Sequence, residues 1–139
     1  MIANILQSVR KHPGMYIPTV NFDAAVGLVV GLDLCTNAGT LSGFHEWLVP
    51  QIGYGNELAW SELVLRLIIP DSADPRRELE NLADQEAIVS RLFDVLIEFF
   101  SVKTSRLGLR KIYRDYEQWL IEQTWYSPTS PHWLEDSSN

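Results

Sequence analysis

The residue types that most often carry catalysis or bind metal ions are few in this chain and lie far apart. Its histidines, His12, His45 and His132, fall in separate segments, whereas a zinc site needs three or four ligands at short, recognisable intervals. Cys35 is the only cysteine, which excludes an internal disulfide and any cysteine-based zinc site. We expect Cys35 to be a small buried side chain near the end of an apolar helix, since nothing marks a base that would activate it. The sequence therefore predicts neither a metal site nor a nucleophile.

Patterns for phosphate binding and for acid–base catalysis are also missing. Residues 39–43 contain two glycines, but no lysine follows them and no strand precedes them, as a phosphate-binding loop requires. Carboxylates such as Asp94, Glu98 and Glu117 are numerous, and in an acidic helical protein their presence is weak evidence for paired acid–base chemistry. We predict that the protein is not an enzyme and uses no cofactor.

The composition is that of one ordinary globular domain. The chain has 139 residues, of which 46% are hydrophobic and 21% charged, values typical of a domain that buries its own core. No N-terminal segment has the parts of a signal peptide, and the longest apolar runs, residues 24–32 and 63–69, are too short to span a bilayer. We expect a soluble, cytoplasmic protein with no membrane partner. The net charge of −7 argues against nucleic acid as a partner as well.

Acidic residues concentrate in the middle of the chain. Residues 57–98 hold ten acids and four bases, whereas residues 99–114 hold five bases and no acid. One interpretation is a solvated surface whose opposite charges meet in the folded protein. The other is an acidic face that binds a basic partner.

One predicted helix carries an unusual pair of glycines. Asn21 is a good cap for a helix over residues 22–34. This helix contains Gly27 and Gly31, and each glycine costs about 1 kcal/mol of helix propensity relative to alanine. We interpret the pair as a place where a second helix packs closely.

Hydrophobic periodicity predicts helices along most of the remaining chain. The first two cover residues 2–11, ended by Pro13-Gly14, and residues 44–49, ended by Pro50. A third is capped by Ser61 and ended by Pro70, and residues 57–69 are the only region where a strand is an alternative. The last two cover residues 76–102, where the apolar stripe thins around 84–86, and residues 105–124. The predicted fold is all-α, a single-domain compact bundle of five or six helices over residues 1–126. Residues 127–139 are expected to form an extended or partly disordered tail.

Residues 9–17 read Val-Arg-Lys-His-Pro-Gly-Met-Tyr-Ile. The Pro-Gly-Met-Tyr phrase resembles the N-terminal arm of type II topoisomerase ATPase subunits such as the DNA gyrase B subunit, but His12 and Pro18 replace the arginine and the glycine that flank it there. In those ATPases the next helix carries a glutamate base and an Asp-Asn pair for magnesium, and residues 21–30 contain neither. We therefore reject ATP hydrolysis and expect the phrase to be a structural turn, with residues 15–17 packed between helices.

The same phrase also resembles one in small bacterial immunity proteins that are encoded beside secreted toxins, including those of contact-dependent inhibition systems. Those proteins continue with an apolar helix that contains a glycine, a Phe-x-x-Trp or Phe-x-x-Phe segment, a Trp-containing helix, an acidic linker and a Phe-rich helix. The corresponding features here are Phe44-x-x-Trp47, Trp60 and residues 93–100, in that order. The resemblance implies an immunity protein that binds and neutralises a cognate toxin by direct contact, with no active site of its own.

The acidic central region supplies the candidate contact residues for a toxin, which we expect to be a basic protein such as a nuclease. The candidates are its carboxylates and two aromatic anchors, of which Trp60 is also a natural core residue: Tyr54, Glu57, Trp60, Glu62, Asp71, Asp74, Glu78, Glu80, Asp84 and Glu86. The alternative is a non-catalytic helical regulatory or adaptor module that binds another protein through Arg106, Arg110 and Arg114 or through the tail. The free protein is expected to be a monomer or a weak homodimer.

Overall fold

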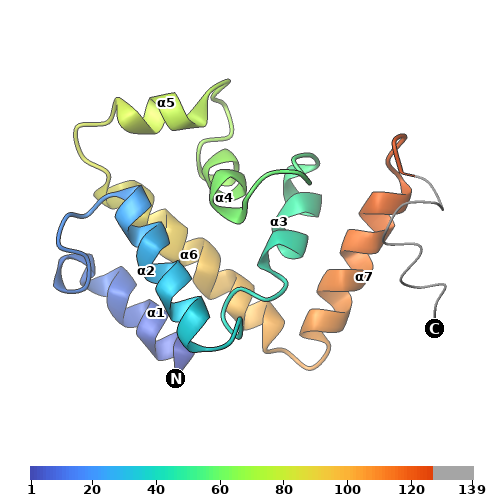
Figure 1. Ribbon diagram of the computed structural model, residues 1–139, viewed down its shortest axis with the longest axis horizontal. Helices are drawn as coiled ribbons and strands as arrows, with labels where there is room; N and C mark the ends of the chain where they lie inside the picture. Colours follow the sequence, from blue (N-terminus) through green and yellow to red (C-terminus); the bar gives the residue numbers. More distant parts are fainter. Residues whose placement is uncertain (127–139) are drawn as a thin grey trace.

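Seven α-helices and one short 3₁₀ helix make up the part of the chain that the structure describes. The computed structural model describes residues 1–126 (Figure 1). The helices are α1 (Ile2–Lys11), the 3₁₀ helix η1 (Pro13–Met15), α2 (Phe22–Cys35), α3 (Phe44–Ile52), α4 (Trp60–Ile68), α5 (Pro75–Glu80), α6 (Glu86–Lys103) and α7 (Gly108–Ile121). No strand occurs in this range, so the predicted all-α class is confirmed. None of these helices is long and apolar enough to cross a membrane.

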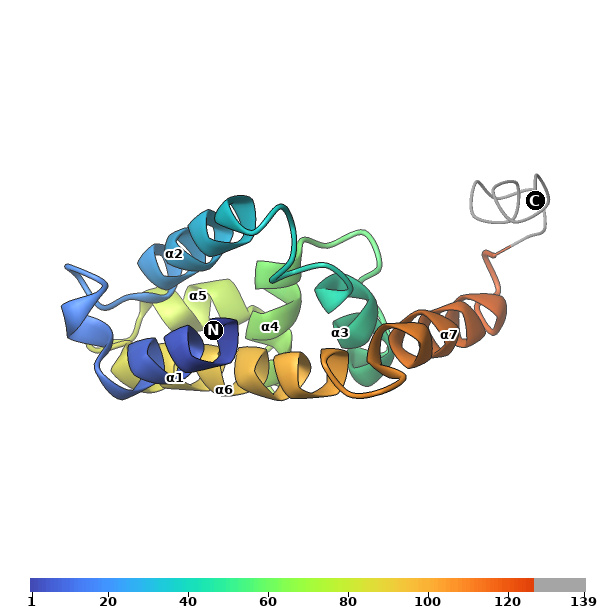
Figure 2. The same cartoon turned by 90° about the horizontal axis from the view of Figure 1, so that it is seen from below.

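Helix α6 is the element on which the rest of the bundle assembles. Helices α1, α2, α4 and α7 all contact it, and its apolar stripe is buried from Val89 to Phe99. Helix α3 packs between α4 and α7. Figures 1 and 2 show α5 and α7 near opposite ends of the bundle, so the carboxylates on α5 lie far from the bases on α7.

Aromatic side chains fill the core where α3, α4 and α6 meet. The Phe44 side chain is fully buried, and its ring centroid lies 4.8 Å from that of Phe99 and 5.6 Å from that of Trp60. Trp47 also packs on Phe99, with 5.5 Å between centroids. Trp60 is thus half-buried and packs against the core.

Local signals set several helix ends as predicted. The Asn21 Oδ1 accepts a hydrogen bond from the Ala24 N–H at 2.8 Å and caps α2. The predicted segment 76–102 is indeed interrupted: α5 ends at Glu80, and α6 begins at Glu86, where the Asp84 carboxylate accepts from the Glu86 N–H at 2.8 Å. This division brings the number of α-helices to seven, above the expected five or six.

Two local predictions are wrong. Helix α3 does not end at Pro50 but continues to Ile52, because buried Leu48 and Val49 hold it in place and Gly53, at φ +87°, provides the left-handed cap one residue beyond Ile52. Ser61 is the second residue of α4, not its cap. The helix predicted before Pro70 is confirmed as α4, and the alternative strand over residues 57–69 does not form.

The expectations for Gly27, Gly31 and Cys35 are also wrong. A Cβ added at either glycine would meet nothing within 4 Å, so no helix of the described chain packs closely there. Cys35 is exposed, not buried. The reason is tertiary: α2 rests on the bundle through the opposite side, where Phe22, Ala25 and Val29 are buried.

The Pro-Gly-Met-Tyr turn packs through only one of the three residues expected. Ile17 is 2% exposed, whereas Met15 and Tyr16 are 76% and 47% exposed. Residues 13–15 form a single 3₁₀ turn, which holds the Met15 side chain out in solvent. The tail predicted for residues 127–139 lies outside the described residues.

Candidate functional site

A groove between α4, α5 and α6 collects part of the acidic region. It has a volume of about 700 Å³, and Asp71, from the α4–α5 loop, and Glu78, from α5, line it. Both are exposed, and neither has an ion-pair partner among residues 1–126. The apolar part of the lining consists of Leu67, Ile68, Ile69, Pro70 and Val95. We call this the α4–α6 groove.

Helix α6 adds two charged residues, Arg91 and Asp94, to the same groove. The Arg91 Nη1 donates to the Ile68 carbonyl at 3.1 Å, and the Asp94 carboxylate accepts from the Arg10 Nε of α1. The hydrogen bond and the charge of Asp94 raise the pKa of Arg10. Asp94 is therefore paired with the charge of Arg10, whereas Arg91 has no ion-pair partner among residues 1–126 and contributes a positive charge to the lining. Asp71 and Glu78 are the two carboxylates of the groove that have no such partner.

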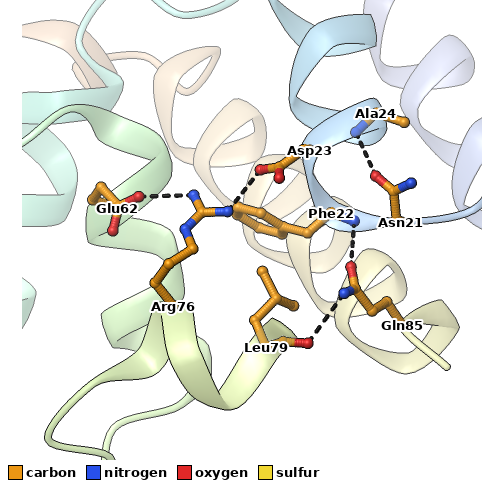
Figure 3. Close-up of polar contacts among 8 residues, drawn as sticks. All are labelled: Asn21, Phe22, Asp23, Ala24, Glu62, Arg76, Leu79 and Gln85. Carbon is orange, nitrogen blue, oxygen red and sulfur yellow. Dashed lines mark hydrogen bonds and ion pairs between the residues drawn. The ribbon is translucent and has the colours of Figure 1, made fainter. Parts of the chain in front are cut away.

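Arg76 holds the acidic segment against the rest of the fold (Figure 3). Its Nη1 donates to the Asp23 carboxylate of α2 and its Nη2 to the Glu62 carboxylate of α4, both at 2.8 Å. Its guanidinium also lies 5.8 Å from the centroid of the Phe22 ring. The hydrogen bond to Glu62, and then the one to Asp23, raises the pKa of Arg76, so this residue is charged at any working pH. We call this arrangement the Arg76 bridge.

Gln85 makes a second connection just before α6. Its Oε1 accepts from the Phe22 N–H at 2.9 Å, and its Nε2 donates to the Leu79 carbonyl at 3.1 Å. Leu79 itself is buried under α5. Helix α5 has only six residues and would not be stable alone. These contacts explain how so short a helix keeps a fixed position.

The predicted acidic residues around α4, α5 and the start of α6 separate into four groups in the structure. Asp71 and Glu78 meet at the groove, whereas Glu62 is engaged in the Arg76 bridge. Two others accept from backbone N–H groups at helix starts: Asp74 from Arg77 at 3.2 Å, and Asp84 from Glu86 at 2.8 Å. The side chains of Glu80 and Glu86 are exposed around α5 and the start of α6.

Tyr54, Glu57 and Trp60 do not belong to this group. Tyr54 and Glu57 lie in the connection between α3 and α4, and Trp60 is the first residue of α4. Figure 1 shows this connection on the α3 side of α4, with α5 on the other side. Tyr54 is 52% exposed, and the Arg66 guanidinium lies 5.6 Å from its ring centroid. Glu57 is exposed, and Trp60 is in the core.

Sequence reasoning missed Arg91 and Asp94 as parts of the site. A signal was present, since charged residues three apart in an otherwise apolar helical segment mark a polar edge on that helix. What spacing could not reveal is that this edge faces the loop that carries Asp71.

The chemistry that the groove offers is contact with a positively charged side chain. Within residues 1–126, no group of three His, Cys, Asp or Glu side chains is placed to hold a metal ion. The half-buried His45 makes a hydrogen bond between its Nε2 and the Asn56 carbonyl oxygen at 3.0 Å. Two available carboxylates above aliphatic walls suit a lysine or arginine side chain, whose methylene stem contacts the walls while its charge meets the acids. Comparison with protein-family models, with curated proteins and with solved structures finds no match for this chain.

Proposed function

We propose that this chain is an immunity protein that neutralises a cognate secreted toxin by direct binding. The observation that supports this most is the α4–α6 groove, where Asp71 and Glu78 lack partners within the described chain and stand at an aliphatic hollow. A basic side chain of a toxin would find both its charge and its stem accommodated there. The order of motifs shared with immunity proteins supports the same function.

Electrostatics gives the acidic end of the molecule a role in choosing the partner. Around the groove, Glu80 and Glu86 add exposed negative charge to that of Asp71 and Glu78. Such a patch speeds association with a basic protein and repels acidic ones. Because the Arg76 bridge fixes α5, the carboxylates are held in position before binding, which lowers the entropic cost of association.

The test is co-expression with the product of the adjacent gene, followed by measurement of the complex. We expect rescue from toxicity and a one-to-one complex. The double variant Asp71→Asn/Glu78→Gln should weaken binding by about 30- to 150-fold, since each lost charge-assisted contact contributes roughly 1–1.5 kcal/mol. No rescue and no complex would overturn the proposal.

A matched control is available on α7, at the other end of the molecule. The variant Asp115→Asn/Glu122→Gln removes the same charge from two exposed positions of that region, and should change affinity less than threefold. Equal losses from the two double variants would show that net charge, and not the groove, sets the affinity.

A second candidate function is that of a non-catalytic adaptor, and one observation favours it. Leu107, Arg110, Lys111 and Arg114 line a hollow of about 400 Å³ on α7. The three bases have no ion-pair partner within residues 1–126. Like charges three and four residues apart destabilise a helix, which is understandable if an acidic protein segment binds there. Binding that is lost in Arg110→Gln/Arg114→Gln, with no response to the groove variant, would support this alternative.

A further inference from the structure

A second groove, between α1 and α2, differs from the first in having almost no polar lining. It has a volume of about 440 Å³ and is lined by apolar side chains and by the backbone of the two α2 glycines. Ile5 of α1, Tyr16 of the turn and Leu28 of α2 are among its walls, and Gly27, Gly31 and Cys35 form its α2 edge. We call this the α1–α2 groove.

The outer face of α2 beside this groove is exposed and uncharged. Val30 is 40% exposed and Leu34 75% exposed, and Gly27, Gly31 and Cys35 share the same side of the helix. From Ala24 to Cys35 the only charged side chain is Asp33, whose Oδ1 accepts from the Leu41 N–H at 2.8 Å and which is half-buried. A solvent-facing helix normally carries charged side chains on its outer side, so the composition of this face is that of a surface which another molecule covers.

The two glycines have no packing role inside the described chain. A Cβ at either position would meet nothing within 4 Å, yet glycine lowers the helix propensity of both positions. Their small size becomes useful only when a helix approaches from outside, since glycines four residues apart let two helix backbones come close.

We propose that a second copy of this chain covers the face, with α2 of each copy packed antiparallel against α2 of the other. Two-fold symmetry then places Gly27 opposite the partner's Gly31 and Gly31 opposite the partner's Gly27, as a self-complementary contact requires. Charge limits where two copies can meet. Each copy carries a net charge of −7, so two copies repel each other, and the repulsion is smallest where the contacting surfaces add no charge of their own. The α2 face is such a surface, since Asp33, its only charged side chain between Ala24 and Cys35, is half-buried.

The size of the face predicts a weak dimer. The twelve residues from Ala24 to Cys35 span about 18 Å, and α2 with the neighbouring strip of α1 is about 20 Å wide. The contact is thus on the order of 400 Å² per copy, roughly half of a standard interface of about 800 Å². We expect association that depends on concentration, with a Kd in the micromolar range or weaker.

The test is sedimentation velocity of the full chain from about 1 µM to 1 mM at physiological salt. The wild-type mass should rise from one copy toward two. Gly31→Glu should raise the Kd at least tenfold, because it places a charge in the contact. This variant should fold normally, since the position is open and glutamate is a better helix former than glycine. Ala3→Glu adds the same charge at an exposed position of α1 that does not line the groove, and should dimerise like the wild type.

Cys35 gives an independent readout on the same samples. Its reaction with a water-soluble maleimide should slow as the wild-type concentration rises, but not in Gly31→Glu. A wild type that stays monomeric throughout would overturn the proposal, as would a dimer weakened equally by both glutamate variants. A monomer that instead binds phosphatidylcholine vesicles through this face would assign the surface to lipid and also overturn it. Toxin neutralisation should survive in Gly31→Glu, so the outcome is separable from that of the proposed function.

Discussion

Arg76→Met is the substitution that most directly tests how the acidic segment is held. It removes both ion pairs of the Arg76 bridge and the contact of the guanidinium with Phe22, while keeping a long side chain on α5. Methionine is about as good a helix former as arginine, so helix propensity does not complicate the comparison.

The expected loss of stability follows from how exposed each partner of Arg76 is. The side chains of Arg76 and Glu62 are 32% and 35% exposed, so their hydrogen-bonded pair is worth about 1 kcal/mol after solvent screening. Asp23 is 73% exposed, and its pair contributes about 0.3 kcal/mol. The contact with Phe22 adds about 0.5–1 kcal/mol. We therefore expect the free energy of unfolding to fall by about 2 kcal/mol, or about 8 °C in Tm for a chain of this size.

The measurement is urea and thermal unfolding followed by circular dichroism, with Arg77→Met as the matched control. Arg77 is the next residue on the same helix, is exposed, and has no ion pair within residues 1–126, so its variant should lose less than about 0.5 kcal/mol. In 1 M NaCl the difference between the two variants should shrink, because screening weakens the ion pairs. Equal stabilities of the two variants at low salt would refute the role assigned to the bridge.

Two further predictions concern the end of the molecule around α7. Burial raises the pKa of the Tyr116 hydroxyl, so the stability that this group contributes is present below pH 10 and is lost as the pH rises through its higher folded-state pKa. Between pH 9 and 11, the Tm of Tyr116→Phe should therefore fall less than the Tm of the wild type. Equal falls in Tm would contradict this. Gly108→Ala should destabilise by at least about 2 kcal/mol, because its Cβ would lie 2.1 Å from the Val102 carbonyl oxygen and 2.4 Å from that of Lys103. Gly14→Ala, where a Cβ has open space, should be nearly neutral in the same urea titration.

Local sequence signals were enough to place most of the helices. The spacing of apolar residues, the Asn21 cap and the break before α6 act over three or four residues, and each could be predicted without knowing the fold. Where a local signal competed with packing, packing prevailed, as at Pro50, which buried neighbours keep inside α3.

The residues of the candidate site could not be selected from local sequence signals. Composition indicated an acidic region but did not distinguish its members. The structure sets Glu62 in an ion pair and Trp60 in the core, and it leaves Asp71 and Glu78 available at one groove.

The sequence by itself determined the all-α class, the main helical segments and the separation of acidic from basic stretches, because these depend on composition and on short-range periodicity. Only the tertiary structure decided that Arg76 joins residues 53 and 14 positions away, and that Gly27, Gly31 and Cys35 face outward. The physical reason is that the side of a helix that becomes buried, and the distant charge that it meets, depend on how helices pack against one another. Spacing within one helix does not contain that information.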